Sequence, residues 1–227
     1  MNPGLQRLVM AEAHCSQEIP SPGRHEAPAT GGDYEAGLAQ RFQMDRMRSD
    51  QLSAVQRVAA GNALAQLGDP RFRPDAWYLP AEALLGFVEI TEGAFLMGSN
   101  LQQEPEAYPD EAPQHVITLP RYFIGRYPVT GRQFHAFIED TQYKPENEGS
   151  LYGPSNHPVV WLGWLDALMY CQWLTARLRD WAETPEPLAS LLRRQGWCVM
   201  LPSEPEWEKA ARGTDARSFP WGKMPNS

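Results

Sequence analysis

The sequence predicts a fold that mixes short β-strands with α-helices, and three features point to it. Apolar residues recur at helical spacing in several segments, and β-branched and aromatic residues gather in short runs between them. Two Ser/Thr-x-x-Glu/Gln patterns mark helix starts. The chain has 227 residues, of which 42% are hydrophobic and 21% charged, which suffices for one large domain or one medium domain with a tail.

Charge and composition exclude several function classes. The net charge is −8, and phosphate-rich partners require cationic patches, so we expect neither a nucleic acid nor an anionic membrane as partner. No apolar run approaches the ~20 residues that would span a bilayer. The first residues contain no apolar stretch long enough for a secretory signal. We therefore expect a soluble, cytoplasmic protein.

Residues 1–48 are expected to be a flexible tail or a linker between domains. They include the stretch IPSPGRHEAPATGGDYEAG, which is rich in proline, glycine and small residues and has almost no large apolar ones. Such a stretch cannot bury enough surface to offset the entropy lost on ordering. The alternative interpretation is a motif that binds a partner.

Residues 49–85 are expected to form one amphipathic helix and a connector. The apolar residues at helical spacing are Leu52, Val55, Ala59, Ala63 and Leu67. Gly68 and the following Asp69-Pro70 end the helix, because glycine suits the left-handed C′ position and proline cannot continue a helix. The helix either packs on the following domain or is the last turn of a helical-repeat array, and one copy does not distinguish the two.

Two β regions follow. Residues 87–90 and 94–97 flank a Glu-Gly pair, which predicts a hairpin with its turn at that pair. Residues 100–114 are polar and interrupted by proline, which indicates a surface loop. The β-branched and aromatic residues of 115–129 predict a second β region.

A helix is predicted from about residue 130 to 140. Thr130 and Gln133 form a capping-box pattern, in which the hydroxyl accepts a free helix N–H and the amide reaches back to the helix start. Val129 and Phe134 are spaced for a hydrophobic staple.

The part of the chain from residue 161 onwards holds seven of the eight tryptophans, so we expect a compact aromatic core there. A helix is predicted from about 163 to 181, and a short strand over 198–201. The apolar face of this helix consists of Trp164, Leu168, Cys171, Leu174 and Leu178.

A last helix begins at a second capping box, made by Ser203 and Glu206, and ends before Gly213. Lys209 and Arg212 lie in its last turn, where the helix dipole favours cations. The residues expected to face inward are Trp207, Ala210 and Ala211.

The three cysteines suggest packing rather than chemistry. Cys171 lies on the apolar face of its helix, where a thiol has a raised pKa and is inert. Cys198 lies in a predicted strand with no base beside it, and Cys15 lies in the tail. The spacing indicates neither a disulfide framework nor a paired metal site.

Other local patterns indicate no active site either. The histidines lack the spacing of a metal site, and they are His14, His25, His115, His135 and His157. Asp110, Glu111 and His115 could share an ion, but the prolines around them favour a solvated loop. Three glutamates are first explained by their place near a helix start, and they are Glu204, Glu206 and Glu208. Phosphate-loop, nucleophile-elbow and dinucleotide motifs are missing. We therefore assign no catalytic or cofactor-binding residue.

Four ordered motifs resemble one family. They are GAFLMGS, APQHVITLPRYFIGRYPVTGRQFHAF, HPVVWLGWLDALMYCQWL, and LPSEPEWEKAARG followed by FPWG. Together they are similar to the formylglycine-generating enzyme domain, also called the sulfatase-modifying factor domain, over roughly residues 86–222.

The resemblance implies an α+β, C-type-lectin-like fold with much irregular structure around a small sheet. It also implies a chemistry, because active members oxidise a cysteine of a sulfatase peptide to formylglycine with molecular oxygen and with copper held by two cysteines. Structural calcium is bound in the family as well. Other members use iron for sulfoxide synthesis or only bind ligands.

The sequence departs from the family pattern after the FPWG segment. The family's second half, with a GNVWEW-type motif and the cysteine pair, would follow there, whereas the sequence stops at Ser227. Cys171 and Cys198 lie upstream of the pair, so neither matches it. Gly131 stands where asparagine is common in the family, and Asn226 is a weak match to a calcium-ligating asparagine.

Two functional hypotheses follow. In the first, residues 86–227 are a formylglycine-generating-enzyme-like domain whose C-terminal half is missing, and the chain alone is inactive. In the second, the domain is a non-catalytic lectin-like module of a bacterial signalling or multidomain protein, and it binds a protein or peptide such as a sulfatase-type peptide through exposed aromatics. The segment RVAAGNALAQLGDPR resembles the helical connector of bacterial fusions. An incomplete domain would also leave strand edges uncovered, so we expect marginal stability or self-association.

Overall fold

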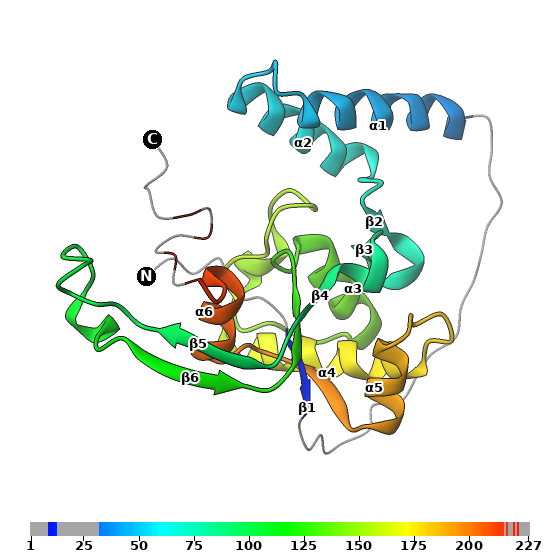
Figure 1. Cartoon of the computed structure of the whole chain (residues 1–227). Helices are drawn as coiled ribbons and strands as arrows, with labels where there is room; N and C mark the ends of the chain where they lie inside the picture. The colour runs from blue at the N-terminus through cyan, green and yellow to red at the C-terminus, as the bar shows by residue number, and fades with distance from the viewer. Residues whose placement is uncertain (1–8, 13–31, 216, 218–219, 221, 223–227) are drawn as a thin grey trace.

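The computed structural model describes residues 9–12, 32–215, 217, 220 and 222, and Figure 1 shows its elements. The helices are α1 (Gly32–Arg48), α2 (Ala54–Leu67), α3 (Gly131–Thr141), α4 (Trp164–Asp180), α5 (Leu188–Arg194) and α6 (Glu204–Arg212). The strands are β1 (Val9–Glu12), β2 (Phe72–Arg73), β3 (Leu79–Pro80), β4 (Phe87–Ile90), β5 (Gly93–Met97), β6 (His115–Leu119), β7 (Tyr122–Gly125) and β8 (Trp197–Met200). Within this part of the chain no helix has the length and apolar character needed to cross a membrane. The mixed α+β class predicted from the sequence is confirmed.

The central sheet has four antiparallel strands in the order β4-β7-β1-β8. Strands β5 and β6 form a two-stranded sheet of their own, which extends away from the central sheet in Figure 1. The short strands β2 and β3 pair with each other. Helices α4 and α5 pack against β8, so the sheet and these helices enclose the main core.

The hairpin predicted within residues 87–97 is wrong. Strand β4 pairs with β7, and β5 pairs with β6, and the register runs without a slip from Phe87↔Gly125 to Met97↔His115. The two pairs are therefore one long antiparallel ribbon with a bend in the middle. The bend coincides with Pro120 on one strand, which has no N–H to donate to a partner strand. The connecting loop of the ribbon is the polar segment 98–114.

The prediction of a flexible tail over residues 1–48 is also wrong in part. Residues 32–48 form α1, which packs against α2 as a helical hairpin at the top of Figure 1. Gly61 of α2 faces Met47 of α1, and a Cβ built at Gly61 would lie 3.9 Å from the Met47 sulfur, which is an ordinary van der Waals distance. Among the described residues, two helices thus precede the main domain instead of one. Residues 1–8 and 13–31 lie outside the described part.

The predicted apolar face of α2 is not the buried one. Ala60 and Leu64 are buried, whereas Val55 is 78% exposed. The other predicted residues are partly or fully exposed, and they are Leu52, Ala59, Ala63 and Leu67. The buried face of α2 differs from the predicted one because α1, which the sequence did not predict, covers an adjacent side of the helix. The predicted end at Gly68 is confirmed, with a φ of 85°.

Helix α2 also contacts the main domain through polar groups. The Ser155 hydroxyl donates a hydrogen bond of 2.9 Å to the Ala65 carbonyl, and the Asn156 amide donates one of 2.9 Å to the Gly61 carbonyl. These two bonds end on backbone oxygens of the helix.

The other predicted helices are confirmed with small shifts at their ends. Thr130 caps α3 and exchanges capping-box hydrogen bonds with Gln133. Helix α4 buries Cys171, Leu174 and Leu178, although Trp164 at its start is 68% exposed. The aromatic core is present as well, and its tryptophans are Trp173, Trp181 and Trp197.

Candidate functional site

Helix α6 is attached to the β5–β6 ribbon by a buried lysine. Lys209 is 3% exposed, and its Nζ donates hydrogen bonds of 2.8 Å and 2.9 Å to the carbonyl oxygens of Thr91 and Gly93. Burial lowers the pKa of this ammonium group. The lysine therefore fixes the start of β5 against the last turns of α6.

The end of β5 is held by two further side chains of α6. The Gly98 N–H donates to Oε1 of Glu208 at 2.8 Å, and Nη1 of Arg212 donates to the Gly98 carbonyl oxygen at 2.6 Å. The same Nη1 donates to Oε1 of Glu208 at 2.9 Å. We call this group, Gly98 with Glu208 and Arg212, the Gly98 clasp.

Gly98 is required in the clasp for two reasons. Its φ is +80°, a left-handed conformation that side chains disfavour. A Cβ built at this position would also lie 2.7 Å from the Glu111 carbonyl oxygen. The Ser99 N–H donates to that same oxygen at 2.8 Å, so the loop backbone cannot move away without losing a bond.

The inward face predicted for α6 is corrected by this geometry. Lys209 and Arg212 are the buried residues, with 3% and 9% exposure, whereas Trp207 is 37% exposed. Ala210 and Ala211 are only partly buried. The helix dipole is a sufficient local reason for cations in the last turn, but both cations also bind carbonyl groups at and just beyond the ends of β5, which are those of Thr91, Gly93 and Gly98. The i,i+4 spacing of Glu208 and Arg212 was the available sequence signal for this arrangement.

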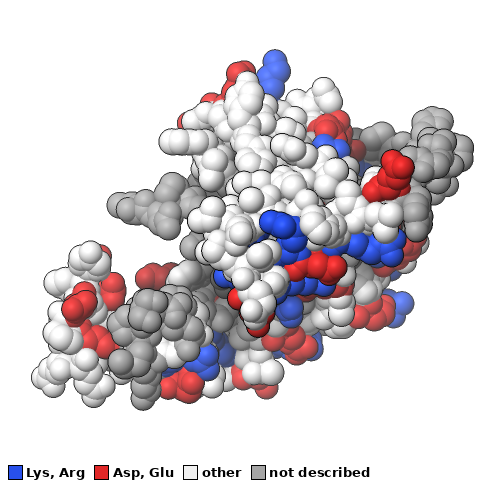
Figure 2. Space-filling model, turned by 90° about the horizontal axis from the view of Figure 1, so that it is seen from above, with Lys and Arg blue, Asp and Glu red and all other residues white. Residues whose placement is uncertain are grey.

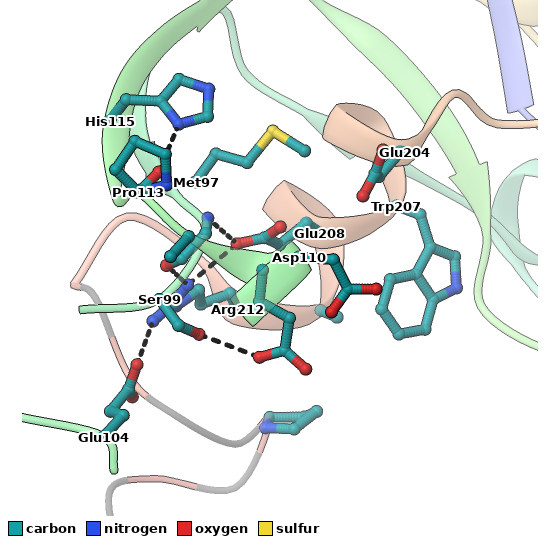
Figure 3. Close-up of a pocket in the computed structure, with 15 residues that line it drawn as sticks. Met97, Ser99, Glu104, Asp110, Pro113, His115, Glu204, Trp207, Glu208 and Arg212 are labelled. Carbon is teal, nitrogen blue, oxygen red and sulfur yellow. Dashed lines mark hydrogen bonds and ion pairs between the residues drawn. The ribbon is translucent and has the colours of Figure 1, made fainter. Parts of the chain in front are cut away.

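A hollow of about 540 Å³ lies between α6 and the loop that precedes β6. Glu204 and Trp207 reach it from α6, and Asp110 reaches it from the 3₁₀ turn Pro109–Glu111. Figure 3 shows these three side chains on the same side of the hollow, with the Gly98 clasp on the other. The clasp therefore forms one wall, and the open side carries carboxylates and an indole.

The charges on the two sides of the hollow differ. Glu208 and Glu104 are paired with Arg212, at 2.9 Å and 3.6 Å. Within the described part of the chain, Glu204 and Asp110 form no ion pair. Acidic side chains also gather on the projecting end of the ribbon at the lower left of Figure 2. The open side of the hollow is therefore negatively charged.

The possible ion site at Asp110, Glu111 and His115 does not assemble. Glu111 accepts a hydrogen bond of 3.1 Å from the Ser99 hydroxyl, and Nδ1 of His115 donates to the Pro113 carbonyl at 2.9 Å. Among the described residues, no three His, Cys, Asp or Glu side chains are placed to share a metal ion. Asn226, considered above for calcium, lies outside the described part.

The described thiols do not fit the copper site that the family implies. Cys171 and Cys198 are 1% and 7% exposed, and neither forms a disulfide. Burial raises the pKa of the Cys171 thiol, and the nearby Cys198 adds to this effect. A thiol must lose its proton to bind a metal or to act as a nucleophile. Neither cysteine lines the hollow. These facts support a packing role, which stays a prediction, and Cys15 lies outside the described residues.

The described histidines outside the hollow make structural contacts. Nε2 of His135 lies 2.9 Å from the Leu151 carbonyl oxygen, and Nε2 of His157 lies 2.8 Å from the Asn62 side-chain oxygen. His157 thus joins the main domain to α2. His14 and His25 lie outside the described part.

Comparison with known proteins agrees with the motifs. Residues 78–227 match the sulfatase-modifying factor enzyme 1-like domain. The chain belongs to the sulfatase-modifying factor family. Membership implies the fold of this family, while the lectin-like description of that fold stays a prediction.

Three relatives show the range of proteins that carry similar sequences. A formylglycine-generating enzyme of Thermomonospora curvata is 29% identical, over 63% of this chain and 54% of that protein. A hercynine oxygenase of Mycolicibacterium thermoresistibile is 28% identical, over 56% of this chain and 31% of that protein. The serine/threonine-protein kinase Pkn1 of Chlamydia trachomatis is 31% identical, over 59% of this chain and 20% of that protein. The chain thus spans about half of the first relative and a third or less of the others.

The Gly98 clasp explains physically why two of the motifs occur together in this sulfatase-modifying factor domain. Gly98 belongs to GAFLMGS, and Glu208 and Arg212 belong to LPSEPEWEKAARG. The two motifs are in direct contact through both backbone groups of the glycine. They act here as a structural attachment, and this leaves Glu204 and Trp207 of the same helix available to the hollow.

Proposed function

We propose that this chain is a ligand-binding member of the sulfatase-modifying factor family and that by itself it does not oxidise cysteine. The observation that carries the proposal is the separation of the thiols from the hollow. Both described cysteines are buried, and the hollow is lined by carboxylates and Trp207. An oxidase site needs an ionisable thiol that substrate can reach.

The ligand is a positively charged segment of a protein or peptide. Glu204 and Asp110 supply negative charge at the open side of the hollow, and Trp207 supplies an aromatic face beside them. Cations are attracted by such a face with about 0.5–2 kcal/mol, depending on solvation. Arg212 does not repel the ligand strongly, because Glu208 and Glu104 neutralise it.

Similar regions occur as parts of longer proteins. The match to the kinase Pkn1 covers one fifth of that protein, so the similar region is only one part of it. The truncation inferred from the sequence stays a prediction, and the proposal does not depend on it.

Fluorescence anisotropy with two labelled peptides tests the binding role. We expect a lysine-rich peptide to bind and a glutamate-rich peptide of equal length to stay free, with affinity falling as salt rises. The double variant Glu204→Gln/Asp110→Asn should bind the lysine-rich peptide roughly 5–10-fold more weakly, corresponding to about 1–1.4 kcal/mol. Glu183→Gln, an exposed glutamate that does not line the hollow, is the matched control. Equal binding by both variants would refute the assignment of the hollow, and binding of duplex DNA would refute the predicted partner class.

An oxidation assay tests the second half of the proposal. The purified chain is incubated with copper, oxygen and a sulfatase-type cysteine peptide, and the mass of the peptide is followed. We expect no conversion, while the formylglycine-generating enzyme of Thermomonospora curvata serves as the positive control. Conversion by this chain alone would overturn the proposal.

A further inference from the structure

A second hollow, of about 360 Å³, lies where α2 meets the main domain, and we call it the junction hollow. Its basic lining residues are Arg57 of α2, Arg71 just before β2, and His157. Its apolar lining includes Met47 of α1 and Val58 of α2. Most of the lining precedes residue 78, where the family match begins, so the α1–α2 hairpin supplies a site that the matched region alone does not contain.

The placement of Arg57 on α2 departs from the usual pattern of a surface helix. Arg57 is the only charged residue of this helix. It shares a face with Gly61, four residues later, whose carbonyl oxygen accepts a hydrogen bond of 2.9 Å from the Asn156 amide of the main domain. Val55 lies on nearly the opposite side and is 78% exposed. A surface helix normally turns its charges outward and its apolar residues inward, and departures from such local rules are expected at binding sites.

The junction hollow is positively charged, although the net charge of the chain is −8. None of its described lining residues is an aspartate or glutamate. Arg71 is neutralised by Asp69, because its Nε donates to Oδ1 at 2.9 Å and its Nη2 donates to Oδ2. Arg57 forms no ion pair with any described residue. With histidine counted as neutral, the hollow therefore presents one uncompensated positive charge.

The available donors fit a carboxylate. Two parallel N–H groups of a guanidinium match the two oxygens of a carboxylate, and Arg57 is exposed, with no side-chain hydrogen bond to a described residue. The two bonds to Asp69 leave Nη1 of Arg71 as a further donor. Nε2 of His157 is already 2.8 Å from the Asn62 side-chain oxygen. One uncompensated charge is balanced by a monovalent carboxylate and not by a phosphate dianion.

The rest of the lining favours a small apolar body next to the carboxylate. Val58 is 58% exposed, so a ligand in the hollow would remove apolar surface of this side chain from water. The volume of about 360 Å³ lies near the lower end of the range for small-molecule sites, which is roughly 300–1,000 Å³. The hollow therefore suits a ligand with a single short apolar side chain.

We propose that the junction hollow binds a monocarboxylate with a short apolar body, and that Arg57 holds the carboxylate. Arg71 adds one donor, and Met47 and Val58 contact the apolar body. Two sources share this chemistry, which are a free N-acyl amino acid and the C-terminus of a peptide. The site differs in place and in sign of charge from the acidic hollow beside α6. Because α1, α2 and the main domain all line it, the bound ligand connects the helical hairpin to the domain and stabilises their attachment.

Titration of the isotope-labelled full chain with N-acetylleucine, followed by nuclear magnetic resonance, tests the proposal. We expect saturable shifts of the Gly61 and Asn156 amide signals, with a dissociation constant in the millimolar range for so small a ligand. N-acetylleucinamide has the same body without the charge and should bind at least about tenfold more weakly. Absence of saturable shifts, or equal binding of the amide, would overturn the site. Inorganic phosphate that displaces N-acetylleucine at lower concentration than acetate would overturn the choice of a monovalent anion.

The variant Arg57→Gln tests the residue that carries the proposal. Glutamine and arginine have similar helix propensities and the position is exposed, so the variant should fold, as circular dichroism will show. It should bind N-acetylleucine about tenfold more weakly than the parent chain. Arg41→Gln, at an exposed position of α1 that does not line the hollow, is the matched control and should bind as the parent does. Equal binding by the two variants would overturn the role of Arg57.

An acetylated tripeptide, Ala-Ala-Leu with a free C-terminus, distinguishes the two sources. Binding at least as tight as that of N-acetylleucine, and weakened by Arg57→Gln to the same degree, would assign the hollow to a peptide C-terminus. Exclusion of the tripeptide while N-acetylleucine binds would assign it to a free acid. Binding of the tripeptide that Arg57→Gln leaves unchanged would place the peptide elsewhere on the molecule and would overturn the peptide source.

Discussion

Nη1 of Arg212 donates a hydrogen bond of 2.6 Å to the carbonyl oxygen of Gly98, a residue 114 positions earlier in the chain. This bond joins the last turn of α6 to the end of β5. Arg212 is 9% exposed, and its guanidinium group also contacts Glu208 and Glu104. The Nε of Arg212 also donates a hydrogen bond of 2.9 Å to the Arg217 carbonyl oxygen, so this cation has four partners. Its loss would remove the positive charge that compensates Glu208 and Glu104.

Replacing Arg212 with alanine should destabilise the domain by about 3–5 kcal/mol. The expected cost is high because Glu208 would stay partly buried with its charge uncompensated. Urea unfolding followed by circular dichroism measures the change. Arg126→Ala is the control, since Arg126 is 56% exposed at its side chain and its pair with Glu82 is worth at most about 1 kcal/mol. Similar losses in the two variants would contradict a buried role for Arg212.

Gly98→Ala should also destabilise the domain, by more than about 2 kcal/mol. Alanine disfavours the left-handed backbone conformation of this position, and its Cβ would clash with the Glu111 carbonyl oxygen. The matched control is Gly153→Ala, because Gly153 has a φ of 117° and open space around its Cβ position. The difference between the two variants isolates the clash with the Glu111 carbonyl at 2.7 Å. The same urea titration gives the free energy of unfolding of both variants. Equal losses would show that the loop carrying Glu111 moves away and avoids the clash.

The elements that the sequence predicts well are those defined by neighbours along the chain. The capping boxes at Thr130 and Ser203 need only a partner three residues away, and both helices begin where expected. The strand pairing failed for the opposite reason. A Glu-Gly pair is a sufficient local signal for a turn, but the choice of partner for β4 depends on β7, which lies beyond the loop.

The site was less predictable than the fold. The helix dipole fully explains a lysine and an arginine in the last turn of a helix. Nothing in the sequence therefore pointed to a second role for them as buried partners of another strand. Their burial became evident only with β5 in place beside α6. Helix α1 was missed because its composition was averaged with the proline-rich segment before it.

Asp69 should stabilise the attachment of the α1–α2 hairpin in a pH-dependent manner. Burial alone would raise the pKa of its carboxyl, but hydrogen bonds from Arg71 and Asn156 outweigh burial and hold the pKa below the ordinary value of 3.8. A carboxyl with a lowered pKa in the folded state stabilises the fold above its ordinary pKa. That stabilisation is lost as the pH falls through the lower folded value.

The variant Asp69→Asn tests this dependence. It should be less stable than the parent chain by about 1.5–3 kcal/mol at neutral pH, because charged hydrogen bonds are lost. The gap should stay constant down to about pH 4 and shrink below it, as measured by thermal melts between pH 2 and 7. Asp50→Asn, on the turn between α1 and α2, is the control. A gap that persists at pH 2 would show that the effect comes from packing and not from the charge.

Cys171 and Cys198 should be unreactive as long as the protein is folded. Both are buried, and burial raises the pKa of the Cys171 thiol, so almost none of Cys171 is thiolate at pH 8. In a Cys15→Ser background, labelling with a thiol reagent should proceed only as fast as the protein unfolds and should accelerate with urea. Val55→Cys, at a position that is 78% exposed, supplies a thiol that reacts at once. Rapid labelling of either native cysteine without urea would mean that substrate-sized molecules reach an ionised thiol in the folded chain, and the assignment of a binding role in place of an oxidase role would then lose its main support.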